Sequence, residues 1–170
     1  NNEKDAIEVI GILEKGVTGV YISNCSDDEK INILKKIKSK KGKINLTEGE
    51  ILNIEKLPLG DRVCIDTITN MKEGEGMLVG DYSNGMVLVN SESLDNPYVA
   101  SRPFRVNAGA VHCYIMLPEN KTKYLADLRS GDNVLIVNHK GETFTSVIGR
   151  IKLEKRPMLR IEVKGKMSNF

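Results

Sequence analysis

The chain has 170 residues, which is enough for one domain or two small ones. Its 25 lysine and arginine residues almost balance 23 aspartate and glutamate residues, so the net charge is only +2. A nucleic-acid-binding domain usually carries a clustered basic excess, and we therefore do not expect a nucleic-acid partner. No apolar run is long enough to cross a bilayer, and the polar, acidic start NNEKDAIEV is unlike a signal peptide, so we expect no membrane partner.

Three cysteines, Cys25, Cys64 and Cys113, are widely spaced and form no CxxC pair. Their odd number and their spacing argue against a disulfide framework and against a zinc cluster. A reducing compartment is the simplest interpretation, and we predict a cytoplasmic protein.

The first part of the sequence predicts a short α/β piece. Residues 6–15 repeat apolar side chains at helical spacing, and residues 17–22 form an apolar run typical of a strand. Ser26 and Glu29 have the spacing of a capping box, which marks the start of a second helix. We expect a helix-strand-helix piece over residues 1–41, which is incomplete as a sheet because it holds one strand.

A basic run, KKIKSKKGK, occupies residues 35–43. It has the composition of a phosphate-binding segment, but no aromatic residue interleaves its charges. We interpret it as the solvated end of the second helix, where positive charge complements the helix dipole.

From residue 42 onward the pattern is that of β-strands. Residues 43–66 predict strands with turns at 48–49 and 58–61. The last of these strands, 62–66, has Asp66 at its C-terminal end. The remaining strands are separated by turns rich in Gly, Asn and Asp, and we expect them at 80–82, 86–90, 134–137, 143–153 and 158–163. The predicted fold is α+β: the piece of residues 1–41, followed by an antiparallel, barrel-like catalytic body over residues 42–170.

One stretch, residues 66–124, combines Gly, Arg, Asn, His and acidic residues without a helical or strand period. Within it, NPYVASRPFRVNAGAVH places Arg102 and Arg105 on either side of a Pro-Phe pair. Guanidinium groups bind carboxylates through two parallel hydrogen bonds, and their charge does not titrate away. We predict that Arg102, Arg105 and the nearby amide of Asn107 bind substrate.

The catalytic candidates are His112, Lys123 and Glu92. His112 is one of two histidines and titrates near neutral pH, although a hydrogen-bonded core histidine is the plainer interpretation. A lysine of lowered pKa acts as a base or forms an imine, so we place Lys123 among the catalytic groups and Lys121 among the substrate-binding ones. A solvated turn lysine is the alternative for either lysine, and a surface position is the default for Glu92.

A glycine-containing segment, MKEGEGM, spans residues 71–77. Glycine permits close approach of a ligand to the backbone, so we predict that Gly74, Glu75 and Gly76 contact a cofactor and that Lys72 contacts substrate. The segment is neither a Walker loop nor a GxGxxG motif, and a polar hairpin is the alternative interpretation.

A divalent metal is a further candidate ligand. The carboxylates of Asp66, Glu75 and Glu92, together with His112, form an oxygen-rich set that suits Mg²⁺ or Mn²⁺ better than Zn²⁺. No characteristic ligand spacing supports this set.

Several of these segments resemble the family of the type II 3-dehydroquinate synthases. The resemblance rests on DTITNMKEGEGMLVG, NPYVASRPFRVNAGAVH and KTKYLADLRSGDNVLIV, and AIEVIGILEKGVTGVYI and LPLGDRVCIDT match the family in the same order. It covers almost the whole chain.

The resemblance implies an enzyme of the shikimate pathway. It implies NAD-dependent oxidative deamination of 2-amino-3,7-dideoxy-D-threo-hept-6-ulosonate, followed by aldol closure to 3-dehydroquinate. Arginines would then hold the substrate carboxylate, and His112, Lys123 or Glu92 would act as bases, with Asn107 as a hydrogen-bond donor. A related branch makes 3-amino-4-hydroxybenzoate with a divalent metal, and the motifs do not separate the two branches.

Family members are longer than this chain at both ends, so we expect a fragment, and we expect part of the NAD site in the N-terminal portion that precedes it in the family. A homo-oligomer is the other partner that we consider. The alternative outside enzymes is a β-barrel module that binds anions or RNA through residues 35–43 and the arginines.

Overall fold

The computed structural model describes residues 26–31, 42–95 and 100–165. The chain divides into two compact units, Asn1–Gly42 and Lys43–Phe170. In the first unit, residues 27–31 are helical. The Ser26 hydroxyl accepts a hydrogen bond from the Glu29 N–H at 3.3 Å, and the Glu29 carboxylate accepts one from the Ser26 N–H at 2.9 Å. These bonds confirm the predicted capping box.

The other elements predicted for residues 1–41 lie outside the described residues, as do residues 35–41 of the basic run. The second unit begins within the two-residue strand β1 (Gly42–Lys43) and contains all the other strands.

The second unit is built almost entirely from strands. They are joined by short turns and by two 3₁₀ turns, and their bounds are β2 (Glu50–Thr67), β3 (Glu75–Tyr82), β4 (Gly85–Asn90), β5 (Arg105–Ala110), β6 (Tyr114–Met116), η1 (Pro118–Asn120), β7 (Thr122–Tyr124), η2 (Leu125–Asp127), β8 (Asn133–Asn138) and β9 (Glu142–Lys164).

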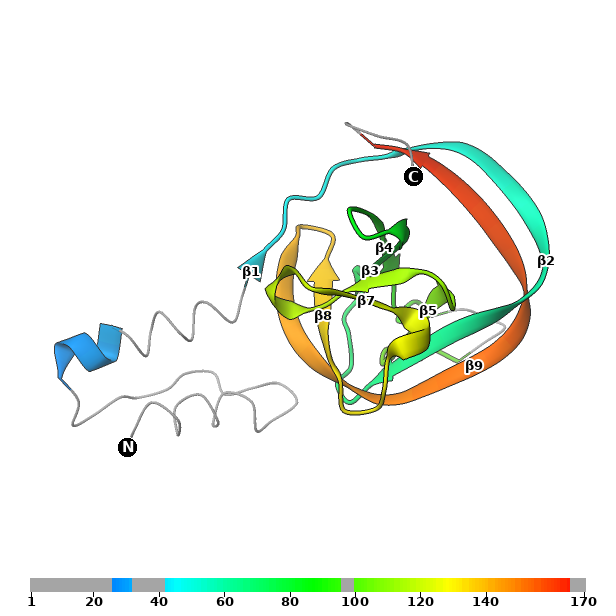
Figure 1. The fold of residues 1–170 in the computed structure, drawn as a ribbon. Coiled ribbons are helices and arrows are strands. Elements are labelled where there is room, and N and C mark those ends of the chain that lie inside the picture. Colours follow the sequence, from blue (N-terminus) through cyan, green and yellow to red (C-terminus); the bar gives the residue numbers. More distant parts are fainter. Residues whose placement is uncertain (1–25, 32–41, 96–99, 166–170) are drawn as a thin grey trace. The chain divides into compact units, whose positions relative to one another are not determined.

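These strands form one antiparallel sheet in the order β5-β2-β9-β8-β3-β6-β7, and β4 pairs with β3 (Figure 1). The sheet curls around a core but does not close. The antiparallel, barrel-like body is therefore confirmed. The predicted turns at 83–85 and 138–141 are also found, where they join β3 to β4 and β8 to β9.

Two predictions about the strands are wrong. Residues 58–61 do not form a turn, because β2 runs through them, and the strands predicted at 143–153 and 158–163 are the single strand β9. Both positions hold a proline near the same irregularity: Leu57 pairs with Met158 and Leu59 with Pro157, so the register shift falls at Pro58. A register irregularity accommodates a proline, which has no N–H to donate, so both strands continue.

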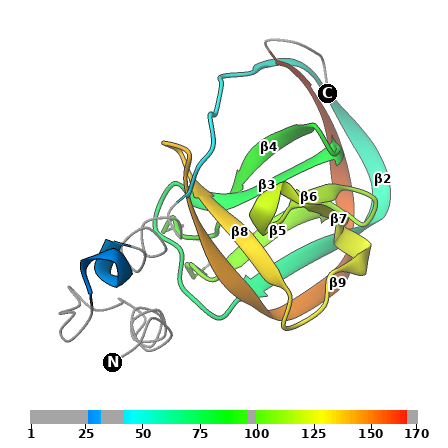
Figure 2. The same ribbon diagram turned by 60° about the vertical axis from the view of Figure 1, so that its left-hand side comes forward.

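The strand expected over 44–46 is also absent, and β2 begins at Glu50. On the N-terminal side of Arg62, where the pairing with β5 stops, β2 and β9 form a long curved ribbon (Figure 2). Apolar side chains on this ribbon are exposed, among them Ile51, Ile54 and Leu59.

The core lies inside the curl of the sheet. It consists of fully buried aliphatic side chains from β2, β3, β5, β6, β8, β9 and η2, including Ile65, Met77, Val106, Ile115, Leu125, Leu128, Ile136 and Ile148. Burial of each such side chain contributes roughly 1.5–3 kcal/mol to folding. This core fixes the strands whose other side carries polar residues.

Candidate functional site

Strands β5, β2 and β9 lie side by side and present two different faces. On β2, Val63 and Ile65 belong to the core, and the residues that alternate with them point to the opposite side. The register places Arg105 and Arg150 on either side of Asp66, and Asn107 and Lys152 on either side of Cys64. We call this side the polar face. It comprises Arg62, Cys64, Asp66, Glu92, Arg102, Arg105, Asn107, Arg150, Lys152, Glu154 and Arg156.

Asp66 lies at the centre of the polar face and binds two arginines. Arg105 donates from Nε and Nη2 to the two carboxylate oxygens at 2.7 and 2.9 Å, and Arg150 donates from Nε at 2.8 Å. Asp66 and Arg105 are buried, whereas the Arg150 side chain is 60% exposed. Burial alone would raise the pKa of Asp66, but the hydrogen bonds from Arg105 and Arg150 outweigh it and lower the pKa.

Glu92 links the next group of side chains. Its carboxylate accepts a hydrogen bond from the Asn107 amide at 2.6 Å and pairs with Arg102 at 3.3 Å. The Asn107 carbonyl oxygen in turn lies 3.1 Å from the Cys64 thiol, whose pKa is raised by burial. Three of the predicted substrate-binding residues and one predicted catalytic residue are thus on the polar face.

Glu154 lies at the other end of the polar face. It accepts hydrogen bonds from Arg62 and Lys152, both at 2.8 Å, and it pairs with Arg156 at 3.3 Å. The hydrogen bonds from Lys152 and then Arg62 lower the pKa of Glu154 to about 2. Glu154 is therefore ionised at neutral pH and holds these cations in place.

Positive charge is in excess on the polar face. Its six arginines and lysines exceed its three acidic residues by three charges. The Nε atom of Arg62 is buried and has no hydrogen-bond partner in the described part of the chain. A buried donor without an acceptor is rare in folded proteins. The excess of positive charge on this face suits it to bind an anion.

A cavity of about 520 Å³ lies beside the core residues of the same strands. Its walls are mostly apolar, and they include Val63, Leu125, Leu128 and Ile151. Arg150 is the one residue of the polar face among the residues that line this cavity. Its guanidinium group binds Asp66.

The ion pairs of Asp66 with Arg105 and Arg150 make the free energy of unfolding depend on pH. A carboxyl group whose pKa is lowered by folding stabilises the native state above its unfolded pKa of about 3.9, and this contribution is lost as the pH falls through the lowered folded pKa. We therefore expect the difference in unfolding free energy between the wild type and Asp66→Asn to be constant at pH 5–7 and to shrink below about pH 4. Urea titrations across this range measure the difference, and a gap that widens in acid would contradict the assignment.

The other predicted catalytic residues lie elsewhere. His112 is exposed in the turn between β5 and β6, and its Nε2 lies 3.3 Å from the Asp81 carboxylate. Lys123, on β7, pairs with Asp132 at 2.7 Å, and Lys121 pairs with Glu119 at the surface. The structure gives each of these three residues its own acidic partner away from the polar face.

The segment 72–76 forms a turn that the chain fills with its own atoms. Glu75 accepts a hydrogen bond from the Lys72 N–H at 2.7 Å. Gly74 has a φ of +78°, and a Cβ there would lie 2.8 Å from His139 Nδ1. A Cβ at Gly76 would lie 2.0 Å from the Val89 carbonyl oxygen. Internal packing therefore explains both glycines, and they do not fit the cradle for a dinucleotide that the sequence suggested.

The predicted metal set does not come together among the described residues. Asp66 is neutralised by two arginines, Glu92 by Arg102, and Glu75 binds a backbone N–H, so a divalent cation at Asp66 or Glu92 would meet guanidinium groups. These surroundings do not fit Mn²⁺ or Mg²⁺. His112 instead lies beside Asp81 and Cys113.

Sequence reasoning missed the contribution of β9 to the polar face. Arg150, Lys152, Glu154 and Arg156 follow one another at every second position, which is the period of a strand with one charged side. That alternation was a usable signal. The predicted break before the second half of β9 concealed it.

No helix in the described residues is long and apolar enough to cross a membrane. Residues 48–170 match the sequence model of the 3-dehydroquinate synthase II C-terminal domain. No solved structure matches the chain.

The curated relatives that match are named 3-dehydroquinate synthase. The protein from Methanococcus maripaludis strain C7 is 53% identical over 170 residues, covering 99% of this chain and 47% of the relative. The protein from Methanococcus vannielii is 55% identical over 165 residues (96% and 46%), and the one from Methanocaldococcus jannaschii is 49% identical over 168 residues (98% and 46%). The chain thus spans about half the length of these relatives. It belongs to the 3-dehydroquinate synthase II family.

Proposed function

We propose that this chain supplies the substrate-binding, β-rich part of a 3-dehydroquinate synthase. The proposed reaction is NAD-dependent oxidative deamination of 2-amino-3,7-dideoxy-D-threo-hept-6-ulosonate and aldol closure to 3-dehydroquinate. The family membership supports the activity, and the polar face supports the binding role. In this proposal the substrate carboxylate binds to the polar face at Arg150.

The observation that carries this proposal is the position of Arg150. Its side chain is mostly exposed, and Asp66 holds its guanidinium group through hydrogen bonds. An arginine held in this way loses little conformational freedom when it binds a carboxylate through two hydrogen bonds. The excess of three positive charges attracts the anionic substrate to the same place.

The remaining polar residues have distinct proposed roles. Asp66 is a positioning residue, because it acts through Arg105 and Arg150. Glu92 is the proposed base on this face, since its carboxylate is partly exposed and already lies beside two donors, Arg102 and Asn107. Asn107 would direct its amide toward a developing enolate oxygen when the substrate displaces its bond to Glu92.

NAD is part of the proposed reaction, but the described residues 72–76 do not fit it. The relatives contain about as much chain again as this one spans, and we propose that the dinucleotide binds there. Binding of NAD⁺ to this chain alone would contradict that placement. The metal-dependent synthesis of 3-amino-4-hydroxybenzoate gains no support from Asp66, Glu75 and Glu92, and the basic run that suggested RNA binding is mostly outside the described residues.

The test is calorimetric titration of the purified chain with the amino-ketose substrate and with 3-dehydroquinate. We expect Arg150→Gln to weaken binding by about ten- to a hundredfold, because a charge-assisted pair contributes roughly 1.5–3 kcal/mol. Arg160→Gln is the matched control: its side chain is 61% exposed and pairs with Glu55 on the ribbon, away from the cavity. Equal affinity of the two variants would refute the binding role of the polar face.

A further inference from the structure

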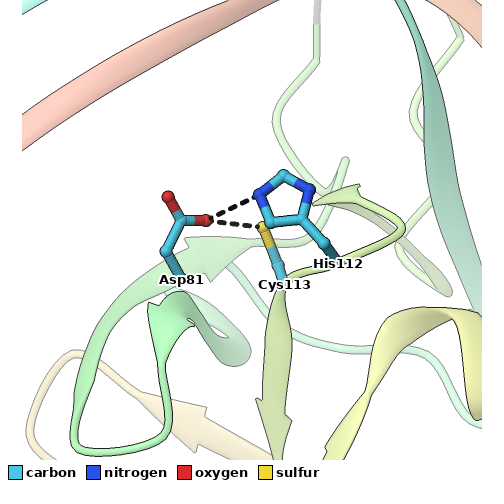
Figure 3. A group of neighbouring side chains, drawn as sticks. All are labelled: Asp81, His112 and Cys113. Carbon is cyan, nitrogen blue, oxygen red and sulfur yellow. Dashed lines mark hydrogen bonds and ion pairs between the residues drawn. The ribbon is translucent and has the colours of Figure 1, made fainter.

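A second cluster of polar side chains lies outside the polar face. It consists of Asp81 at the end of β3 and of His112 and Cys113 in the turn before β6 (Figure 3). Figure 3 shows the imidazole and the thiol both directed at the same carboxylate. One Asp81 oxygen lies 3.3 Å from His112 Nε2 and 3.1 Å from Cys113 Sγ. One atom from each of the three residues lies within 4.8 Å of the other two.

We propose that Asp81, His112 and Cys113 bind a divalent transition metal of the zinc class. This site is separate from the proposed synthase function, which it does not require. The inference rests on the spacing of the three ligand atoms, on the rigidity of the backbone that carries them and on the local charge.

The spacing matches a tetrahedral site. With metal–ligand bonds of about 2.0 Å to nitrogen and oxygen and about 2.3 Å to sulfur, tetrahedral geometry separates a nitrogen and an oxygen by about 3.3 Å, and a sulfur and an oxygen by about 3.5 Å. The His112–Asp81 distance already has this value, and the Cys113–Asp81 distance needs to open by a few tenths of an ångström. Three protein ligands leave the fourth position for water.

The backbone holds these ligands in place. Gly80 pairs with Tyr114, so the antiparallel register of β3 and β6 places Asp81 opposite Cys113. The Cys113 N–H donates to the Ala110 carbonyl at 3.0 Å, and its own carbonyl accepts from the Leu125 N–H at 2.8 Å. Ligands fixed by neighbouring strands lose little entropy when a metal binds.

The local charge also favours a cation. Within the described residues, Asp81 has no lysine or arginine at ion-pair distance, and its partner is an imidazole that is positive only when protonated. When a divalent cation binds, the Cys113 thiol proton passes to the buffer as the metal–sulfur bond forms.

Residue chemistry selects the class of metal. Thiolate and imidazole ligands favour zinc, cobalt and related ions over magnesium, calcium and manganese. The sequence spacing of the cysteines argued against a zinc cluster built from several thiols. A site with one thiol, one imidazole and one carboxylate has no such sequence signature, since Asp81 lies 32 residues before Cys113.

The test is titration of the untagged chain with Co²⁺, under anaerobic reducing conditions and in a Cys25→Ser background. We expect one Co²⁺ per chain, with absorption from thiolate-to-cobalt charge transfer that Zn²⁺ abolishes by displacement. Cys113→Ser is expected to remove this band, and Asp81→Asn and His112→Gln to weaken binding at least tenfold. Binding to the background chain should tighten as the pH rises, because the Cys113 thiol releases its proton.

The matched controls are Cys64→Ser and His139→Gln, which change the other described cysteine and the other histidine. Both are expected to bind Co²⁺ as the background chain does. Circular dichroism without metal checks that every variant is folded. A band that survives Cys113→Ser, a band lost equally in Cys64→Ser, or a folded background chain that shows no charge-transfer band would each overturn the proposal.

Discussion

Replacing Asp66 with asparagine is expected to lower the free energy of unfolding by about 3 kcal/mol at pH 7. The substitution preserves the shape of the side chain but leaves the buried Arg105 guanidinium without its counter-charge. Breaking a buried ion pair by removing one partner typically costs 3–5 kcal/mol. Loss of the pair with Arg150 adds little to this cost, because the Arg150 side chain is exposed to water. The measurement is urea unfolding at neutral pH, followed by circular dichroism.

Asp61→Asn provides the matched control for this prediction. Asp61 lies on the same strand and pairs with Lys155 at 3.1 Å, but both side chains are exposed. Exposed pairs contribute about 0–1 kcal/mol, so this variant should unfold almost as the wild type does. If the two variants lose the same stability, Asp66 does not organise the polar face.

Replacing Gly76 with alanine is expected to cost about 3 kcal/mol of stability, at the upper end of overpacking effects. The added methyl group would lie 2.0 Å from the Val89 carbonyl oxygen and 2.7 Å from the Asn90 Cα, so β3 and β4 must separate. Backbone atoms of a paired strand have little freedom to move away. Thermal and urea unfolding of the variant measure this loss.

This prediction distinguishes two explanations of Gly76. If the glycine serves a dinucleotide, alanine should leave stability unchanged and affect cofactor binding alone. Gly60→Ala is the control, because the nearest atom to its new methyl group is the Met158 Cγ at 2.9 Å, in a flexible side chain that can move aside. We expect Gly60→Ala to change stability by less than about 1 kcal/mol.

The sequence was most informative where local chemistry decides the structure. The capping box at Ser26 and the turns at 83–85 and 138–141 depend on residues close together in the chain, and all three are present. The strand predicted at 62–66, which carries Asp66, is the C-terminal part of β2. The turn predicted at 58–61 and the break predicted between 153 and 158 do not exist, because only the pairing of distant strands shows that β2 and β9 continue past Pro58 and Pro157.

In the candidate site, too, the sequence predicted the residues that lie close together in the chain and missed those that come from a distant strand. Arg102, Arg105, Asn107 and Glu92 were found from one dense segment, and the structure places them on the polar face. Arg150, Lys152 and Glu154 complete that face from β9, more than forty residues later, and sequence spacing contains no information about the register that brings them there. Composition suggested His112 as a catalytic partner of this group, but its position is set by the pairing of β3 with β6.

The long ribbon has a consequence for how the domain folds. Thr67 pairs with Ile148 and Glu50 with Lys164, so every contact along β2 and β9 joins positions more than eighty residues apart. Loop closure over such distances costs entropy before the contacts form, which slows folding. Hairpins such as β3–β4 and β8–β9 form locally. The part of β2 before Arg62, which carries the apolar Ile51, Ile54 and Leu59, pairs only with β9 and stays unpaired until β9 is present. During synthesis on the ribosome, we therefore expect the backbone hydrogen-bonding groups of this part of β2 to remain unpaired until β9 has emerged.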